Sequence, residues 1–196
     1  KNKCYGNRKL LNGREVSEIS AALNETDNSH EKPAVLKANK SLCFTGPEIL
    51  GSGFLISSDR ANEILKKHPE YKKVLQPYIT GDDITSKPVL SSERWVINFH
   101  DFPLKRTTDY PGPVAADFPE LLEIVEACVK PFRLKSNNQK ARNLWWQFGS
   151  RAEKMKKAVA ELKQVIICSL TAKYFAFRVC NPNDFEFSIL VKVFAF

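Results

Sequence analysis

Few side chains of this sequence have the spacing that catalysis or metal binding requires. The three histidines, His30, His68 and His100, lie far apart, and none has a second ligand at a metal-binding separation. We therefore expect surface or structural roles for them. A glycine-bearing stretch is not followed by the Gly-Lys-Ser/Thr of a phosphate loop, so turns or bulges explain it better. Its glycines are Gly46, Gly51 and Gly53.

Two polar clusters are similarly incomplete. CNPND, residues 180–184, lacks the second proline and the aromatic residue of the Asn-Pro-Pro-aromatic tetrapeptide of amino-methyltransferases, and it predicts a hairpin turn at Asn183-Asp184. GDD, residues 81–83, could form a metal-binding carboxylate set with Asp101, but a capping or turn role is favoured. The sequence therefore predicts a chain that is non-catalytic by itself and holds no metal and no cofactor.

The positive charge is concentrated in one part of the chain. The 196 residues carry a formal net charge of +8, and residues 130–163 contain ten basic side chains against only Glu153 and Glu161. This segment therefore carries the whole excess, as expected of a polyanion binder; the alternative is a solvated helix face. The ten are Lys130, Arg133, Lys135, Lys140, Arg142, Arg151, Lys154, Lys156, Lys157 and Lys163.

Two adjacent tryptophans, Trp145 and Trp146, lie inside this basic segment, in KARNLWWQFGSR (residues 140–151). They could stack on nucleic-acid bases or anchor a core. Adjacent helical residues point about 100° apart, so we expect at least one indole to be a structural anchor. The basic residues around them are then the expected phosphate contacts, which position a protein on DNA without reading sequence. These are Lys140, Arg142 and Arg151, and Lys154 is a further candidate for DNA binding.

The elements that would position these residues begin after a polar stretch of forty residues with a turn-rich linker at 25–33. Residues 42–57 predict two short strands joined by glycine-bearing turns. A helix is expected from near Ser58 to just before Pro69. A loop is expected at 77–88, and a strand at RWVINFH, residues 94–100.

Two helices are expected in the next part of the chain. Asp117 with Glu120, and Ser150 with Glu153, have the spacing of capping boxes. The first helix should stop at Pro131 and bury an apolar stripe. The stripe is Phe118, Leu121, Leu122, Val125, Cys128 and Val129.

Three strand-like segments, residues 165–169, 173–180 and 185–196, close the sequence. Helices and strands are mixed without regular alternation. The sequence therefore predicts an α+β domain, with mixed or antiparallel sheets packed with several helices, rather than a doubly wound parallel sheet.

Several features bear on the cellular location of the protein and on the extent of its chain. The five cysteines are scattered and have no zinc-knuckle or redox spacing, which fits a reducing cytoplasm. No apolar stretch approaches the roughly 20 residues that span a bilayer, and no secretory signal is recognisable, so no membrane partner is expected. The chain starts at Lys1 and stops inside the apolar ILVKVFAF, so we expect a fragment of a larger protein.

Five stretches occur in the order in which one protein family has them. FTGPEILGSGFLIS, PYITGDDI, RWVINFHDFPL, KARNLWWQFGSR and VIICSLTAKY resemble consecutive blocks of the target-recognition region of MmeI-like proteins. These are large adenine-specific DNA methyltransferases, often fused to a nuclease as restriction-modification enzymes. The opening KNKCYGNRKLLNGREVSEISAALNE resembles the segment that connects the methyltransferase core to this region, so the resemblance covers nearly the whole chain.

The resemblance implies a connector over residues 1–40 and a DNA target-recognition domain over residues 41–196, in a bacterial or archaeal cytoplasm. Double-stranded DNA and the methyltransferase domain of the same polypeptide would be the partners. That domain would bind S-adenosylmethionine and methylate a flipped adenine. One departure concerns Arg151, which precedes Ala152 where the family's block has arginine followed by proline.

In such a domain, base-reading residues are expected near the C-terminal strands. Ser169, Thr171 and Lys173 lie in the VIICSLTAKY block, and the Arg178 guanidinium could pair with guanine in the major groove. The alternative for Arg178 is a solvent-facing strand residue. Arg94 is a weaker candidate and could be an internal ion-pair partner.

Two other functions remain open at this point. One is a protein–protein interaction module that docks a partner through a basic face and exposed aromatic residues. The other is an enzyme in its own right, such as a nuclease.

Overall fold

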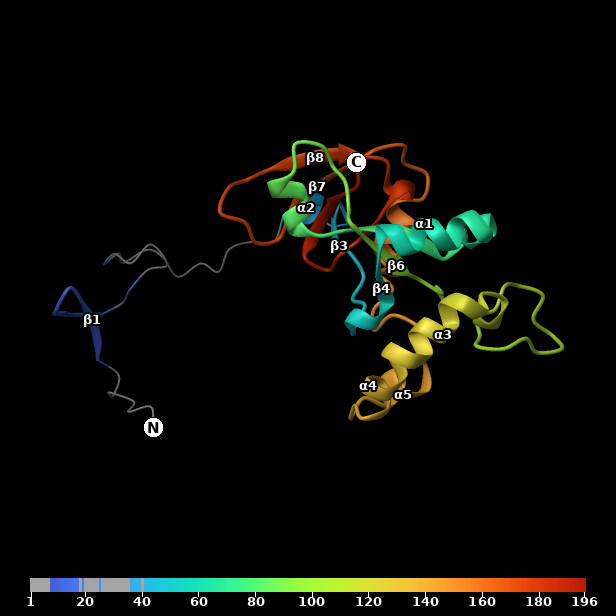
Figure 1. Ribbon diagram of the computed structural model, residues 1–196. Coiled ribbons are helices and arrows are strands. Elements are labelled where there is room, and N and C mark those ends of the chain that lie inside the picture. Colours follow the sequence, from blue (N-terminus) through green and yellow to red (C-terminus); the bar gives the residue numbers. More distant parts are fainter. Residues whose placement is uncertain (1–7, 18, 20–24, 26–35, 40) are drawn as a thin grey trace. The chain divides into compact units, whose positions relative to one another are not determined.

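The computed structural model describes residues 8–17, 19, 25, 36–39 and 41–196. The chain divides into two compact units, Lys1–Ala38 and Asn39–Phe196. In the first unit, strands β1 (Lys9–Leu11) and β2 (Arg14–Val16) form an antiparallel hairpin (Figure 1). Its turn residues Asn12 and Gly13 have φ of 50° and 78°, the positive pair that a two-residue hairpin turn favours. Apart from Glu25, the predicted linker at 25–33 lies outside the described residues.

The first sheet of the Asn39–Phe196 unit is mixed, with strand order β4-β6-β5-β9. β6 lies between β4 and β5 in antiparallel pairing, and β9 joins β5 in parallel. The larger core of the unit lies between this sheet, α1 and α3. The elements are β4 (Leu55–Ser57), α1 (Ser58–Lys67), β5 (Leu75–Ile79), β6 (Arg94–Ile97), α3 (Pro119–Cys128) and β9 (Glu186–Phe187).

The second sheet is antiparallel throughout, with order β3-β10-β7-β8. One of its faces packs with α2 and α6 over a second, smaller core. The elements are β3 (Cys43–Thr45), α2 (Gly81–Ser86), α6 (Glu153–Val159), β7 (Val165–Ser169), β8 (Phe177–Cys180) and β10 (Val191–Phe194). The α+β prediction is therefore confirmed.

The remaining elements are short. Two short helices follow α3 within residues 130–163 (Figure 1). In addition, 3-10 turns occur between the longer elements. They are α4 (Lys130–Leu134), α5 (Gln139–Asn143) and the 3-10 turns Lys37–Asn39, Ser52–Phe54, Pro69–Lys73, Ala115–Asp117 and Pro182–Asp184. Within the described part of the chain, no helix is long and apolar enough to cross a membrane.

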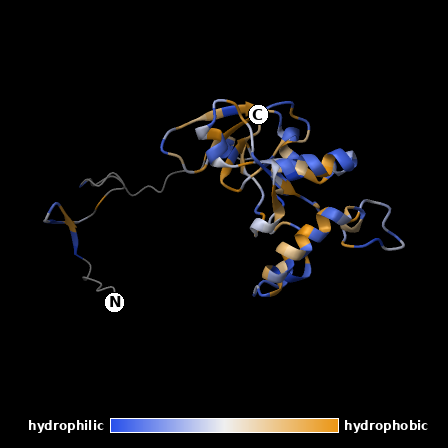
Figure 2. Cartoon of the chain, viewed as in Figure 1, coloured by the Kyte–Doolittle hydropathy of each residue, from blue (hydrophilic) through white to orange (hydrophobic). Residues whose placement is uncertain are grey.

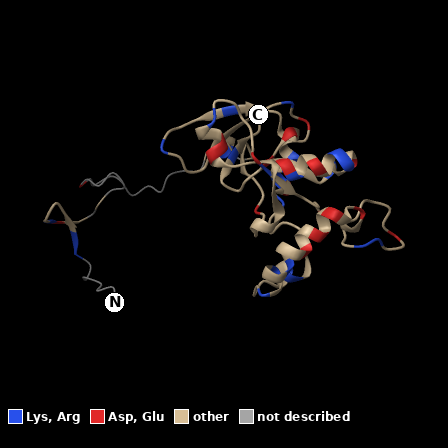
Figure 3. Ribbon diagram, viewed as in Figure 1, with Lys and Arg blue, Asp and Glu red and all other residues tan. Residues whose placement is uncertain are grey.

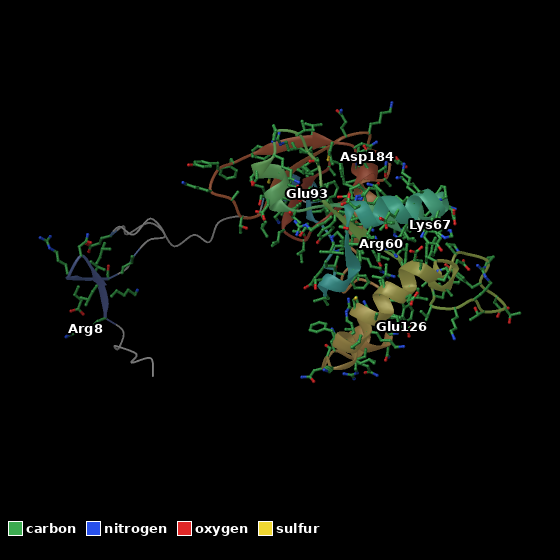
Figure 4. The ribbon with its side chains drawn as sticks, viewed as in Figure 1. Arg8, Arg60, Lys67, Glu93, Glu126 and Asp184 are labelled. Carbon is green, nitrogen blue, oxygen red and sulfur yellow. The ribbon has the colours of Figure 1, made fainter. Side chains whose placement is uncertain are left out.

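Helix α1 forms where the sequence predicts it. The Ser57 side chain caps it by accepting a hydrogen bond from the Arg60 amide, and the helix ends at Lys67, before Pro69. Most of its residues are hydrophilic, and hydrophobic residues occur between them (Figure 2). Arg60 lies on the side of α1 that faces α3 and binds Glu120 there at 2.7 Å (Figure 4).

Several local predictions were wrong because tertiary contacts replaced local ones. The loop expected at 77–88 contains part of β5 and the whole of α2. The stretch from 185 to the end is two strands in different sheets, since β9 pairs with β5 and β10 with β7. The segment 173–180 is a strand only from Phe177 onward.

Both expected capping boxes are also absent. Asp117 caps the preceding 3-10 turn, accepting from the Val114 amide at 3.0 Å, and α3 begins at Pro119. Ser150 forms a β-bridge with Glu48 instead of capping α6.

The end of α3 also differs from its prediction. Cys128 is exposed, and Pro131 lies in the first turn of α4 rather than ending α3.

The glycines near β3 serve two purposes. Gly51 has φ of 137°, as a turn requires. At Gly46 a Cβ would lie 2.4 Å from the Phe187 and Ser188 carbonyl oxygens, and at Gly53 it would lie 2.6 Å from the Cys128 Cβ. Close approach of two segments, rather than a bulge, therefore explains Gly46 and Gly53.

Candidate nucleic-acid interface

A groove with a volume of about 610 Å³ lies beside β3 and brings together basic residues from three segments. Lys140 comes from α5, Arg151 from the segment before α6, Lys154 from the first turn of α6, and Lys192 from β10. Glu153 is the single carboxylate among the described residues that line it. We call this surface the basic groove. Three of its four cations, Lys140, Arg151 and Lys154, were predicted to contact DNA.

The local structure around each cation explains its position. The Asn138 side chain caps α5 by accepting from the Ala141 amide at 3.2 Å, which leaves Lys140 in the first turn and exposed. β10 pairs with β3, the strand at the edge of the sheet, and this pairing sets Lys192 opposite Thr45. Lys192 was missed because a lysine in an apolar strand looks like an isolated surface charge. Only the strand register shows which groove it enters.

The backbone between the two tryptophans and α6 is specific to this sequence. Ala152, next to Arg151, has φ of 50°, in the left-handed region. A proline ring holds φ near −65° and is incompatible with this conformation. A proline therefore cannot follow Arg151 on this path of the chain.

Arg142 and Arg151 each form a contact with another group of the protein. Arg142 Nη1 donates to the Ser136 carbonyl at 2.6 Å. Arg151 Nη2 binds Glu153 Oε1 at 2.5 Å, which offsets part of the positive charge of the groove. No described carboxylate lies within ion-pair distance of Lys140, and the same holds for Lys154 and Lys192, so these lysines carry the net charge.

Both tryptophans are core residues, so the expected structural anchor is confirmed and extends to the second indole. Trp145 and Trp146 expose only 6% and 8% of their surface and pack edge to face. Trp146 Nε1 donates to the Phe102 carbonyl at 2.9 Å, and Gln147 Nε2 donates to the same oxygen. Neither indole is free to stack on a base.

Arg133, one of the ten basic residues of 130–163, is buried and was therefore wrongly counted toward a binding surface. It is 2% exposed, lies over the Phe54 ring and donates to the carbonyl oxygens of Leu50, Ile49 and Gln147. Burial lowers the pKa of its guanidinium, and Glu48 acts in the opposite direction. This arginine satisfies backbone acceptors inside the fold and is not part of a binding surface.

The ten basic residues of 130–163 therefore do not form one continuous surface. Besides Arg133, Lys130 binds Glu126 at 2.6 Å and Lys156 binds the buried Glu186 at 3.1 Å. Glu126 belongs to α3, along which acidic residues are visible (Figure 3). Of the ten, Lys140, Arg151 and Lys154 line the basic groove, whereas Lys135, Lys157 and Lys163 are exposed outside its lining.

The predicted base-reading residues differ in whether their side chains already form hydrogen bonds within the protein. Ser169 Oγ donates to the Thr171 carbonyl at 2.8 Å and so stabilises its own turn. Thr171 and Lys173 are exposed in the β7–β8 loop, and Lys173 Nζ lies 5.1 Å from the centroid of the Tyr174 ring.

Arg178 has an internal role in the fold. Its three nitrogens donate to the carbonyl oxygens at the end of α2, namely Ile84, Lys87 and Pro88, at 3.2, 2.5 and 3.1 Å. These bonds use three of the five guanidinium N–H groups and hold Arg178 against the end of α2, which favours an internal role over base reading.

The GDD segment has a capping role, as predicted. Asp83 Oδ2 accepts from the Thr80 amide and hydroxyl at 3.0 and 2.7 Å. Burial acts to raise the Asp83 pKa, but the hydrogen bonds from Thr80 and Lys87 outweigh it and lower that pKa. Arg94 Nη2 lies 3.8 Å from the same carboxylate, which confirms its reading as an internal ion-pair partner.

The structure shows no assembled catalytic group in the part of the chain it describes, and no cluster of three potential metal ligands was found there. His68 lies beside Glu70, and His100 Nε2 lies 3.0 Å from the Lys73 carbonyl. Burial raises the pKa of Cys180 to about 11, so its thiol stays protonated at neutral pH. The residues after it form a 3-10 turn between two sheets rather than the expected hairpin.

No protein-family model matches the chain, and no curated protein matches its sequence. Its fold is similar to that of a solved structure of the Type IIL restriction-modification enzyme MmeI in complex with DNA, with a TM-score of 0.60. Sequence identity is 12%, and the match covers 93% of this chain and 23% of that one. The chain thus spans about a quarter of that enzyme, and at this identity the likeness shows the fold.

Proposed function

We propose that the Asn39–Phe196 unit binds duplex DNA through the basic groove and acts as a target-recognition domain of an adenine-specific, restriction-modification type methyltransferase. The observation that carries the proposal is the convergence of Lys140, Lys154 and Lys192 from separate segments on one groove. Like charges held together repel one another, and a polyanion relieves that repulsion. Similarity to the fold of an enzyme solved with DNA supports the same choice of partner.

The proposal includes a division of labour. This chain would bind the duplex and help to select its sequence, and it is itself non-catalytic. Methylation of adenine with S-adenosylmethionine is assigned to another domain of the same polypeptide, the second partner of this unit.

The contacts can be sorted by their chemistry. The three unpaired lysines of the groove would bind phosphates as point charges, and Arg151 would join them by exchanging Glu153 for a phosphate oxygen. Thr171 and Lys173 are the exposed candidates for base edges. Ser169, Arg142 and Arg178 are used inside the fold, and we assign them positioning roles.

A salt titration of duplex binding tests the proposal. With about four to six phosphate contacts, the logarithm of the association constant should fall with the logarithm of salt concentration with a slope of about −4 to −5. Fluorescence anisotropy of a labelled duplex between low and moderate salt measures it. Undetectable binding, or a slope near zero, would contradict the proposal.

The exposed aromatic residues Tyr174 and Phe175 favour a second function, a protein–protein interaction module. Competition separates the two functions. Heparin or unlabelled bulk DNA should displace a ligand held by phosphate contacts, whereas a protein held through apolar anchors would stay bound. A plasmid incubated with the protein and magnesium should remain intact, since cleavage would indicate a nuclease.

A further inference from the structure

One face of the second sheet is partly exposed: Phe177 and Val179 on it are 57% and 59% exposed, whereas Cys168 is buried. Successive strand residues point to opposite faces, and Ile167 and Val193 point into the smaller core. Their neighbours therefore point outward. We call this surface the open face. Its residues, in register, are Phe177 and Val179 of β8, Cys168 and Ile166 of β7, Lys192 and Phe194 of β10, and Thr45 and Cys43 of β3.

Aromatic rings form a row along the open face, starting at the β7–β8 loop. Phe175, in the loop, is 94% exposed, and its ring stacks nearly parallel to that of Phe177, with centroids 6.2 Å apart and planes at 11°. The Phe177 ring lies 6.3 Å from that of Phe194. The Phe175 ring is therefore almost fully open to solvent, and the offset Phe177 ring covers little of it.

The row of rings leads into the basic groove. Lys192 lies two residues from Phe194 on the same face, and it also lines the groove. At the other end, Lys173 is two residues before Phe175. No carboxylate occurs among the open-face strand residues or in the described loop 170–176, so the charged side chains of this surface are all cationic.

This combination fits a nucleobase better than a protein side chain. Bases present flat aromatic surfaces linked by phosphates, so a row of rings with a lysine near each end matches them. An exposed phenylalanine on a projecting loop is also the kind of side chain that enters a partly unstacked base step of a duplex. A partner protein would have to bring carboxylates and apolar groups together over the same surface.

We infer that Phe175 is a base-stacking wedge, which enters a weakened base step of the duplex whose phosphates lie in the basic groove. The inference rests on the proposed duplex binding and names how the bound DNA is contacted. Insertion costs the unstacking of one base step, and the exposed Phe175 ring stacks on the bases in return.

Duplexes that are already unstacked at one position test the wedge without knowledge of the recognised sequence. The wild-type chain should bind a duplex with a single-nucleotide bulge about tenfold more tightly than the intact duplex, since part of the unstacking cost is already met. Phe175→Ala should reduce this preference to less than twofold. Phe175→Trp should retain it, because an indole stacks at least as well.

The control is Phe132→Ala, which removes a 64% exposed phenylalanine of α4 and should leave the preference unchanged. Equal thermal unfolding midpoints of the variants would show that all are folded. If wild-type protein binds intact duplex with the expected salt dependence but shows no preference, or if Phe175→Ala keeps it, the wedge is wrong and duplex binding stands. If no duplex is bound at all, the proposed function and the wedge both fail.

Discussion

The four cations of the basic groove differ in whether they form an ion pair within the protein. Arg151 is bound to Glu153, whereas Lys140, Lys154 and Lys192 have no described ion-pair partner. An unpaired lysine loses nothing inside the protein when it binds a phosphate, while Arg151 must first give up a carboxylate. The lysines should therefore dominate the salt dependence of binding.

Lys192→Ala should weaken binding of any duplex to a similar degree and should reduce the magnitude of the salt slope by about one, because one phosphate contact is lost. Lys192→Arg should retain the slope. Anisotropy titrations at several salt concentrations measure both.

The matched control is Lys67→Ala, which removes an exposed lysine at the end of α1, away from the groove lining (Figure 4). Equal loss of affinity in Lys67→Ala and Lys192→Ala would show a diffuse electrostatic effect rather than a groove.

At the scale of elements, the six-residue helix α2 shows how a weak local pattern becomes ordered. Thr80 and Asp83 satisfy its first amides, and Arg178 of β8 satisfies carbonyl oxygens at its other end. A cation at a helix C-terminus also interacts favourably with the helix dipole. Arg178 thereby ties α2 to the strand that carries Phe177, behind the open face.

The Asp83 carboxylate gives α2 a pH dependence whose sign follows from the structure. The folded state lowers the Asp83 pKa below the ordinary value of 3.8, so its stabilisation is complete above that value. It is lost as the pH falls through the lower, folded-state pKa.

Asp83→Asn should lower the free energy of unfolding by about 1 to 2 kcal/mol at pH 7. The difference from wild type should shrink below about pH 4. Urea unfolding at pH 7, 5 and 3 measures this, with Asp82→Asn, an exposed neighbour, as the control. A difference that stays constant down to pH 3 would contradict the ionised cap.

At the scale of the whole Asn39–Phe196 unit, two cores meet at Glu186. This residue is 3% exposed on β9, which pairs with β5 of the first sheet. Its carboxylate accepts from Asn98 Nδ2 at 2.6 Å and from Lys156 Nζ at 3.1 Å. Asn98 follows β6 in the first sheet and Lys156 lies on α6 over the second core, so one carboxylate joins the two.

Glu186→Ala should lower the free energy of unfolding by about 2 kcal/mol, because it leaves a buried amide and a partly buried ammonium without their acceptor. Glu161→Ala, which removes an exposed carboxylate just after α6, should cost much less. Urea unfolding monitored by tryptophan fluorescence and by circular dichroism measures both variants.

The two probes also test whether the cores unfold together. Trp95, Trp145 and Trp146 all belong to the first core, whereas circular dichroism reports on both. Coincident transitions are expected for the wild-type protein. If Glu186→Ala costs no more than Glu161→Ala, the junction does not couple the cores.

Local features could be predicted from the sequence because they depend on residues close together in the chain. The apolar, β-branched run at 165–169 coincides with β7, and Pro69 and Ser57 bound α1. The β1–β2 hairpin was not predicted, although its Asn-Gly turn is also a local feature. Concentration of charge in residues 130–163 was evident from composition, and most of the groove cations come from it.

The tertiary structure alone decided which of these charges face a ligand. Arg133 is buried because three carbonyl oxygens lie within its reach, two of them more than eighty residues away in the chain. Lys192 joins Lys140 because β10 pairs with β3, and Phe175 is 94% exposed because it lies in the loop before β8. A local sequence pattern reports the periodicity of one segment. The burial of a side chain depends on which distant segment packs against it, and that is determined only when the whole chain folds.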